Sequence, residues 1–416
     1  MDYLELIKRQ PPEKEALVED GISFSYGDLV SLAQIQAEKY ARTPTQRAVH
    51  VIKEKKISHQ LIAFLACFLT QDVPLVVPWE SEYFQRDACI MAGEVPEQAC
   101  VAVATSGTSG TPKIYFRTYE SWADYFPIQN KIFHIREDSR LFAQGSLSFT
   151  GNMNLYLALF YAGGTVIAEN EFRPGDWAGR IREQRADGIY LIPSKLLLLP
   201  RLIKHPNDQI KAIISGSQSL GRPEAESLKT IFPKAEIILY YGATELNYIT
   251  YITDDMMTEQ RNLIGKPFPK VDVSIRGEEI FVSTAYSVED ISCPYTLSDK
   301  GAMDASGNLY FLGRSDDILL HRGHKVSSMK VEHFLEGIAG VEEAAVCMAK
   351  SRRWREAQIV AYLVASSPHS ITEQEVLSIL RRGLHRYELP RRIFFVDALP
   401  KNASGKVDKK QLRMLE

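Results

Sequence analysis

Short apolar runs rich in β-branched residues recur along the first 240 residues of the chain. These runs are residues 101–105, 188–192, 210–214 and 236–241. Between several of them lie polar segments with apolar residues at helical spacing, at 177–185 and 223–231. Alternating strands and helices of this kind are typical of an α/β sheet with helices on its faces.

The pattern changes near residue 270, where three short strand-like segments are separated by Gly and Asp turns. These segments, 270–275, 278–283 and 308–313, predict a small β-meander or barrel part. The large N-terminal domain is therefore expected to combine α/β sheets with this meander. We place it at residues 1–315.

A third pattern follows Asp316. Ser327 or Ser328 can cap a helix whose apolar stripe includes Val331 and Leu335. Strands are expected at 343–349, 358–365 and 393–396, with a helix at 373–387. This pattern predicts a small α+β domain at residues 316–416, of a common domain size.

Composition narrows the function classes. The 416 residues carry a formal net charge of −3, so no general basic field points to nucleic acid or to an anionic membrane. The longest apolar run, 61–69, is too short to span a bilayer, and the first ten residues lack the apolar core of a signal peptide. The five cysteines form no C-x-x-C pair, so we expect a reduced, cytoplasmic protein. The oligomeric state stays open.

The stretch VATSGTSGTPK, residues 103–113, concentrates glycines and hydroxyl residues before a lysine. Closely spaced glycines allow several backbone N–H groups to point at one oxyanion, and Lys113 adds a positive charge. The alternative is a solvated loop. A Walker loop is excluded, because that requires Gly-Lys-Ser/Thr and here Pro112 precedes the lysine.

Three further segments carry candidate chemistry. Thr244 and Glu245, in YYGATELN, follow an apolar strand, and ligands bind at the carboxyl ends of strands in α/β sheets. Glu245 is a hard oxygen donor suited to Mg²⁺. Asp299 can accept ribose hydroxyls, and Arg314 offers a planar donor fork. Lys406 lies in a polar segment near the C-terminus. For the charged residues among them the alternative is an ordinary solvated or salt-bridged charge.

The order of these segments resembles the adenylate-forming superfamily, which comprises acyl- and aryl-CoA ligases, peptide-synthetase adenylation domains and luciferases. The family pattern T-S-G-[ST]-T-G-x-P-K is similar to residues 105–113, and Y-G-x-T-E to residues 241–245. G-R-x-D-D and G-[HY]-[RK]-V are similar to 313–317 and 323–326, and P-K-x-x-x-G-K to 400–406. The match spans nearly the whole chain in the family's order.

The resemblance implies that a carboxylic acid and ATP form an acyl-adenylate and pyrophosphate, with Mg²⁺. Lys406 would lie between the substrate carboxylate and the α-phosphate, where it offsets the repulsion of two anions. Thr244 would contact the α-phosphate, and Glu245 would hold Mg²⁺. The remaining implied contacts with ATP or AMP come from the phosphate loop, the adenine edge and the ribose: Thr105, Ser106, Gly107, Thr108, Ser109, Gly110, Lys113, Ser215, Gly216, Ser217, Tyr241, Gly242, Asp299 and Arg314.

The resemblance also implies a second step, in which the small domain turns about Asp316 and the acyl group passes to a thiol. Gly323, His324 and Lys325 would then replace Lys406 and contact the pantetheine arm of CoA or of a carrier protein. Arginine clusters at 352–355 and 381–386 are candidate contacts for CoA phosphates or an acidic carrier protein, with ordinary surface charges as the alternative.

Four features depart from the family pattern. The N-terminal part is short, and TLSD replaces T-G-D before Asp299. The segment QGSLSFTGNMNLY, residues 144–156, lacks the family's histidine, and Arg117 stands where a histidine is common. We expect the last two departures to bear on the acid rather than on ATP. The predicted acid pocket is lined by Ser146, Ser148, Phe149, Asn152, Gln218 and Asn247.

These polar residues favour a small, polar or aromatic acid over a long alkyl chain. The leading hypothesis is an acyl- or aryl-acid CoA ligase. The alternative is an acid–AMP ligase that loads a separate phosphopantetheine carrier protein. A degenerate relative that binds nucleotide without catalysis is a third hypothesis, against which the matching Thr244, Glu245, Asp299, Arg314 and Lys406 argue.

Overall fold

The computed structural model describes residues 3–40, 47–85, 89–90, 95–105, 112–259, 261–314, 317–350, 354, 356–367, 371–401 and 407–412. It has the predicted mixed α/β architecture with a small C-terminal α+β part. The chain divides into two compact units. The first unit comprises residues 1–259, 264–273 and 282–295, and the second comprises 260–263, 274–281 and 296–416. The boundary proposed at 315/316 stays a prediction, because both residues lie outside the described part.

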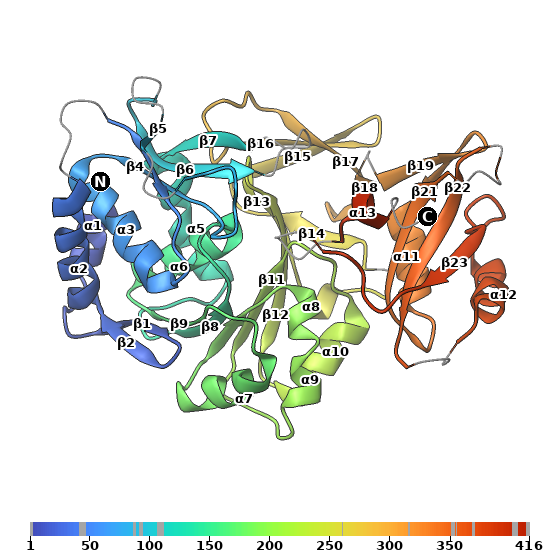
Figure 1. Ribbon diagram of the computed structural model, residues 1–416, viewed down its shortest axis with the longest axis horizontal. Helices are drawn as coiled ribbons and strands as arrows, with labels where there is room; N and C mark the ends of the chain where they lie inside the picture. Colours follow the sequence, from blue (N-terminus) through green and yellow to red (C-terminus); the bar gives the residue numbers. More distant parts are fainter. Residues whose placement is uncertain are drawn as a thin grey trace. The chain divides into compact units, whose positions relative to one another are not determined.

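A large sheet forms the centre of the first unit (Figure 1). Five neighbouring strands run parallel: β9 (Thr165–Glu169), β8 (Arg140–Gln144), β10 (Gly188–Tyr190), β11 (Ala212–Gly216) and β12 (Glu236–Ala243). Beside β9 lie β1 (Glu15–Glu19) and β2 (Ile22–Ser25), and beside β12 lie the antiparallel β13 (Asn247–Thr253) and β14 (Leu263–Pro267). The four apolar runs predicted from the pattern are confirmed as strands, with ends shifted by a few residues.

Helices surround this sheet, and Figure 1 shows α10 beside β11 and β12. Helix α6 is buried along most of its length, because its apolar residues lie on all sides. None of the described helices is long and apolar enough to cross a membrane. The helices of the first unit are α1 (Tyr3–Lys8), α2 (Tyr26–Tyr40), α3 (Ile57–Thr70), α4 (Tyr119–Trp122), α5 (Phe126–Ile132), α6 (Thr150–Ala162), α7 (Pro174–Glu183), α8 (Pro193–Leu196), α9 (Leu199–Leu202) and α10 (Arg222–Ile231).

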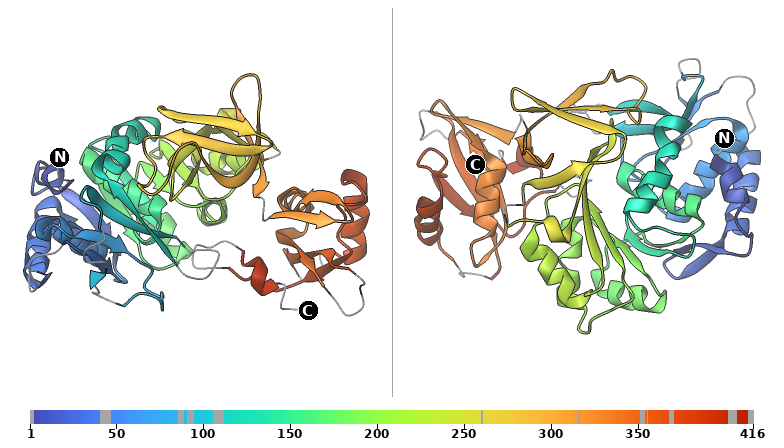
Figure 2. Two further views of the ribbon diagram at one scale, coloured as in Figure 1. Left: turned by 90° about the horizontal axis from the view of Figure 1, so that it is seen from above. Right: turned by 180° about the vertical axis from the view of Figure 1, so that it is seen from behind.

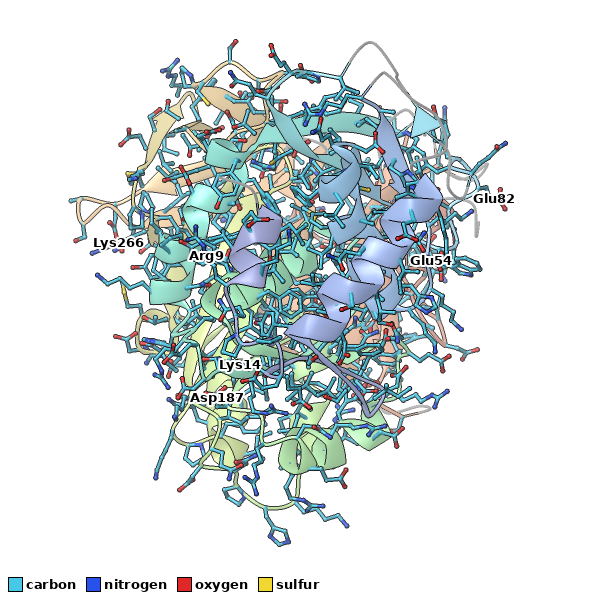
Figure 3. All side chains as sticks on the ribbon, turned by 90° about the vertical axis from the view of Figure 1, so that its left-hand side faces the viewer. Arg9, Lys14, Glu54, Glu82, Asp187 and Lys266 are labelled. Carbon is cyan, nitrogen blue, oxygen red and sulfur yellow. The ribbon has the colours of Figure 1, made fainter. Side chains whose placement is uncertain are left out.

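A second sheet in the first unit has the order β5-β3-β4-β6-β7. Its strands are β3 (Val49–Ile52), β4 (Val73–Val76), β5 (Cys89–Ile90), β6 (Ala99–Thr105) and β7 (Lys113–Thr118). Valines 49, 51 and 73 with Phe116 build its apolar core. Charged side chains such as Glu82 and Lys266 project from the edge of the molecule in Figure 3.

The three predicted meander segments are confirmed as β15 (Val271–Arg276), β16 (Glu279–Thr284) and β18 (Leu309–Arg314). A further strand that was not predicted, β17 (Tyr295–Met303), lies between β16 and β18, and the residues of these strands are shared between the two units. The rest of the second unit holds a hairpin and a three-stranded sheet with helices beside it (Figure 2). These elements are β19 (Ile318–His321), β20 (His324–Ser327), α11 (Ser328–Glu336), β21 (Val341–Ala349), β22 (Gln358–Ala365), α12 (Glu373–Gly383), β23 (Arg392–Phe395) and α13 (Lys409–Leu412).

Two local predictions in this unit have different outcomes. Ser327 caps α11 through a hydrogen bond from the Lys330 N–H to its hydroxyl, and Val331 and Leu335 enter the core as predicted. Helix α12 ends at Gly383 rather than at Tyr387. The extended backbone of Leu384 ends it, and glycine has low helix propensity.

Candidate active site

A tight hairpin carries Thr244 and Glu245. Strand β12 ends at Ala243 and β13 begins at Asn247, and Ala243 and Asn247 are register partners across the hairpin. A Cβ at Gly242 would lie 2.5 Å from the Asn247 carbonyl oxygen, so the close approach of the two strands requires glycine here. Thr244 and Glu245 therefore lie at the carboxyl end of β12, as predicted.

Other segments hold this loop in place. Arg117 Nη2 donates to the Thr244 carbonyl at 2.5 Å, and the Val288 N–H donates to the Glu245 carbonyl at 2.9 Å. The hydroxyls of Thr150 and Thr244 are 3.1 Å apart. Thr150 begins α6, so a helix, a strand and a distant loop all fix the position of this hairpin.

Arg117 is fully buried on β7. Its Nη1 donates to the carbonyl oxygens of Ser121, at 3.1 Å, and Tyr286, at 2.6 Å. Burial lowers the pKa of Arg117 to about 10, while nearby Cys100 and Glu245 act in the opposite direction. The guanidinium of Arg117 is used on backbone carbonyls, and the expectation that this residue bears on the acid stays a prediction. Its sequence neighbours gave no indication of this role, since Thr244 and Tyr286 are remote in the chain.

The predicted adenine edge lies at the end of β11. Ser215 Oγ donates to the Leu191 carbonyl at 2.7 Å, and Ser217 has a left-handed backbone with φ 69°. A Cβ at Gly216 would lie 2.5 Å from the ring of Tyr240, so glycine lets this backbone pass close over the ring. The hydroxyl of Tyr240 on β12 is 2.8 Å from that of Tyr190 on β10, the strand on the far side of β11. Tyr241 and Gly242, the other predicted nucleotide contacts here, follow on β12.

The predicted acid-pocket residues divide into two groups. Three have structural partners: Asn247 Oδ1 accepts from Asn154 Nδ2 at 3.0 Å, Gln218 Oε1 accepts from the Ser194 N–H at 3.0 Å, and Ser146 Oγ donates to Gln60 Oε1 at 3.1 Å. Asn154 also accepts from Trp122 Nε1 at 3.2 Å, so the side chain of Asn247 belongs to a buried network that the sequence did not reveal.

The second group lies at the start of α6. Phe149 precedes this helix, and Asn152 is buried in its first turn, close to Gly145. Ser148 Oγ is buried and has no hydrogen-bond partner among the described residues. A buried polar atom of this kind needs a partner, and a bound ligand is one source.

The phosphate-loop prediction falls on a β-hairpin of the five-stranded sheet. Thr105 ends β6, Lys113 begins β7, and the two are register partners. Ser106, Gly107, Thr108, Ser109 and Gly110 lie outside the described residues. So do Asp316, Lys406, the side chain of Lys325, and Arg352, Arg353 and Arg355.

The predicted ribose pair lies in the second unit. Asp299 and Arg314 are register partners on β17 and β18, and Arg314 Nε is 3.4 Å from Asp299 Oδ1. The side chain of Asp299 is 7% exposed and that of Arg314 is 54% exposed. Ser298, which replaces the family's glycine, has φ 60°, a left-handed conformation that favours glycine. Within β17, the backbone at Ser298 therefore has a conformation that favours the glycine of the family pattern.

The predicted thiol-arm segment forms the β19–β20 hairpin of the same unit. Gly323 has φ 78° at the turn, and a Cβ there would meet no atom within 4 Å. The ring of His324 stacks on Tyr387, with centroids 4.3 Å apart.

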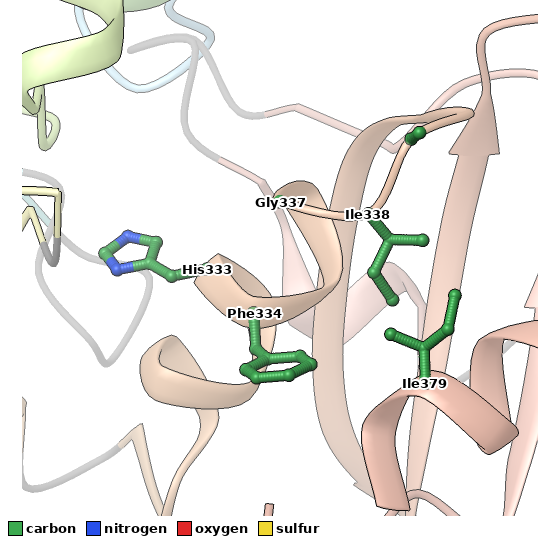
Figure 4. Close-up of a pocket in the computed structure, with 6 residues that line it drawn as sticks. His333, Phe334, Gly337, Ile338 and Ile379 are labelled. Carbon is green, nitrogen blue, oxygen red and sulfur yellow. The ribbon is translucent and has the colours of Figure 1, made fainter. Parts of the chain in front are cut away.

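A hollow of about 460 Å³ lies beside α11 and α12 in the second unit (Figure 4). It is lined by His333, Phe334, Gly337, Ile338, Ala339 and Ile379. Among the described residues, none of the predicted site residues lines it, and most of its lining is apolar.

Comparisons with known proteins agree with the motifs. The AMP-binding enzyme family matches residues 40–281, and the AMP-binding enzyme C-terminal domain matches residues 330–406. Relatives include an uncharacterized acyl-CoA ligase of Bacillus subtilis, 24% identical over 76% of this chain and 69% of that protein. A putative long chain fatty acid-CoA ligase of Staphylococcus epidermidis is 22% identical over 99% of this chain and 97% of its own. The 2-succinylbenzoate–CoA ligase of Bacillus pumilus is 26% identical over 76% of this chain and 69% of that protein.

Two solved structures are similar over the whole chain. O-succinylbenzoate coenzyme A synthetase from Bacillus subtilis, in complex with AMP, superposes with a TM-score of 0.84 at 20% identity and covers 99% of this chain and 98% of its own. ATP-bound MatB from Rhodopseudomonas palustris gives the same values. At this identity the two structures establish the fold. The chain belongs to the AMP-binding enzyme family, the adenylate-forming superfamily predicted from its motifs, and is an enzyme of the acid–thiol ligase class.

Proposed function

We propose that this enzyme activates a small carboxylic acid with ATP, releases pyrophosphate, and passes the acyl group to the thiol of CoA. The observation that carries the proposal is the hairpin of Thr244 and Glu245, held by Arg117 at the carboxyl end of the parallel strands. The CoA-ligase names of the relatives support CoA as the acceptor.

In the first half-reaction an oxygen of the substrate carboxylate attacks the α-phosphorus of ATP. The bond from that phosphorus to the bridging oxygen breaks, and pyrophosphate leaves. Positioning and charge neutralisation carry such a step. The hydroxyl of Thr244 is proposed to donate to the α-phosphate, and Lys406 is proposed to offset the repulsion between the two anions.

Magnesium fits the residues present, because Mg²⁺ in nucleotide sites is held by one or two carboxylates and the substrate phosphates. Glu245 supplies one partly exposed carboxylate at the end of β12, and no cluster of three or more ligating side chains occurs in the described ranges. The ion would neutralise phosphate charge. An O-succinylbenzoate coenzyme A synthetase of Bacillus subtilis has been solved with ATP and a magnesium ion.

In the second half-reaction the thiol sulfur attacks the acyl carbon, and AMP leaves with the former carboxylate oxygen. We propose that residues 316–416 turn about Asp316 for this step. Gly323 at the tip of its hairpin leaves open space where a side chain would stand, which suits passage of a narrow pantetheine arm. Lys325 follows in the same hairpin.

The acceptor and the acid have alternatives. A phosphopantetheine carrier protein offers the same thiol arm, and its acidic surface would suit the arginines at 381, 382 and 386. The buried hydroxyl of Ser148 favours a small polar or aromatic acid over a long alkyl chain, because an alkyl group leaves that hydroxyl unpaired.

The experiment is an ATP–pyrophosphate exchange screen with aryl, short-chain and long-chain acids, followed by detection of the acyl-CoA for each active acid. We expect exchange with a small polar or aromatic acid and a CoA thioester from the same acid. Exchange with only long saturated fatty acids contradicts the pocket assignment. Exchange without any CoA product, but with loading of a carrier protein, selects the alternative acceptor.

A further inference from the structure

Lys195 lies on the short helix α8, directly after β10, on the same edge of the sheet as Thr244. Its ammonium group donates a hydrogen bond to Gln144 Oε1. Gln144 ends β8, which is the parallel neighbour of β10. The strand on the other side of β10 is β11, and the loop after it carries Gln218, bonded to Ser194 next to the lysine. Three neighbouring strand ends thus place polar side chains together.

The lysine has a charge that its surroundings do not balance. Burial lowers the pKa of Lys195, and within the described part of the chain no carboxylate forms an ion pair with it. The carboxylate in register with Gln144 is Glu169, which pairs with Arg180 at 3.2 Å. A partly buried ammonium with one neutral acceptor is costly, and an anion beside it would offset that cost.

The amide of Gln144 is oriented by a second hydrogen bond. Its Nε2 donates to the Asn170 carbonyl at 3.3 Å, so its Oε1 faces Lys195. This arrangement holds the ammonium at the strand ends, and among the described residues its other N–H donors have no acceptor, so a ligand can accept from them. Gln144 is followed at once by residues 145–149, which are part of the predicted acid pocket.

We propose that Lys195 binds a second anionic group of the acid substrate, so that the enzyme selects dicarboxylic acids over neutral acids of the same length. The inference rests on the proposed function, because the reacting carboxylate must lie near Thr244. Two strand spacings, about 10 Å in total, separate β10 from β12. The extended side chain of Lys195 can span part of this distance. A short aliphatic diacid or an aromatic diacid matches that span.

The test uses matched acids and matched variants. Glutarate is compared with its monomethyl ester, and isophthalate with its monomethyl ester, in ATP–pyrophosphate exchange. The variants are Lys195→Met, which removes the charge, Lys195→Arg, which keeps it, and Lys204→Met, a control at an exposed lysine after α9. We expect the wild type and K204M to prefer a diacid to its ester by about tenfold or more in kcat/KM.

In K195M the KM for the diacid should rise about tenfold or more while kcat stays within about twofold, and K195R should keep the preference. Thermal-shift titration with the diacid alone gives a readout independent of turnover, and K195M should lose the diacid-induced shift. The proposal is overturned if the wild type has equal kcat/KM for the diacid and its ester. It is also overturned if K195M loses kcat/KM equally for both acids. A rise in the KM of CoA alone also overturns it.

The two proposals fail separately. If no acid supports exchange in any variant, the proposed function fails. The thermal shift then decides the inference: a diacid-induced shift in the wild type that K195M loses supports it, and its absence in the wild type overturns it. K195R supplies the same comparison if K195M does not fold.

Discussion

The guanidinium of Arg117 donates a hydrogen bond to the carbonyl oxygen of Thr244, a residue 127 positions away in the sequence. Arg117 lies on the strand that leaves the predicted phosphate loop, and Thr244 lies in the loop proposed to contact the α-phosphate. One buried side chain thus fixes the distance between the two segments that are predicted to hold ATP phosphates. Arg117 is a positioning residue, since its contacts are backbone carbonyls.

Arg117→Met should remove three hydrogen bonds to the carbonyls of Ser121, Thr244 and Tyr286. Leaving buried acceptors unpaired should lower the free energy of unfolding by about 3 kcal/mol, measured by urea denaturation. Exchange activity at a temperature where the variant is folded should fall at least about tenfold, because the loop is no longer held. The control is Arg136→Met at an exposed arginine. An R117M enzyme with wild-type activity contradicts the positioning role.

Lys406→Ala should reduce adenylation by orders of magnitude, because nothing then offsets the repulsion between the carboxylate and the α-phosphate. Transfer of the acyl group from a supplied acyl-adenylate to CoA should be much less affected. Single-turnover measurements of each half-reaction separate the two effects. Lys401→Ala is the matched control from the same segment, since Lys401 pairs with Glu343 at 2.6 Å on the surface. Wild-type pyrophosphate exchange in K406A refutes the assignment.

Ser298→Gly should stabilise the protein. Ser298 has φ 60°, which costs an L-residue roughly 1 kcal/mol relative to glycine. The Ser298 N–H to Thr296 Oγ1 hydrogen bond, at 3.0 Å, comes from the backbone and survives the change. A urea unfolding midpoint that rises by the equivalent of about 1 kcal/mol is expected, with no gain in Ser298→Ala. A lower midpoint in S298G would show that the serine side chain stabilises the turn.

Two titratable groups on α11 should give opposite pH dependences of stability. Burial raises the pKa of Glu336 to about 7 from 4.5, although Arg261, 3.1 Å away, acts against the rise. The folded state keeps the proton longer than the unfolded state, so this group lowers stability progressively from about pH 4.5 to 7. Burial and then Arg261 lower the pKa of His333 from 6.5 to about 4, so this group raises stability as the pH rises from about 4 to 6.5.

The two contributions should largely cancel between pH 4.5 and 6.5. In Glu336→Gln only the histidine effect should remain. The free energy of unfolding of this variant should rise by up to about 3 kcal/mol between pH 4 and pH 6.5, whereas that of the wild type should change much less. In His333→Asn only the glutamate effect should remain, so the free energy of unfolding should decline as the pH rises. Water near the Glu336 side chain, which is 29% exposed, should make its decline smaller than the pKa change alone implies. Parallel pH profiles of the two variants would contradict the opposite signs.

Much of the fold was predictable because the apolar runs that become β10, β11 and β12 are short, β-branched and bounded by turns. The Thr244–Glu245 site could be placed because its residues follow such a strand directly. Ser327 could be identified as a cap from its position alone. These features depend on neighbours in sequence.

The rest depends on contacts between remote segments. The contacts of Arg117 could not be predicted, because two of its partners, Thr244 and Tyr286, are remote in the sequence. The Asn154–Asn247 bond joins residues 93 positions apart in the sequence, and no local pattern marks it. Lys195 resembles a surface lysine after Pro-Ser until the sheet order places it beside Gln144. Helix α12 was predicted too long because apolar spacing continues past Gly383.

The central claim, formation of an acyl-adenylate, has a direct isotopic test. The preferred acid is supplied with ¹⁸O in its carboxylate, together with ATP, Mg²⁺ and CoA, and the products are analysed by mass spectrometry. The account predicts that one ¹⁸O atom appears in AMP and none in pyrophosphate, because the carboxylate oxygen becomes part of the AMP phosphate. Transfer of ¹⁸O to inorganic phosphate, with ADP as the nucleotide product, would contradict it.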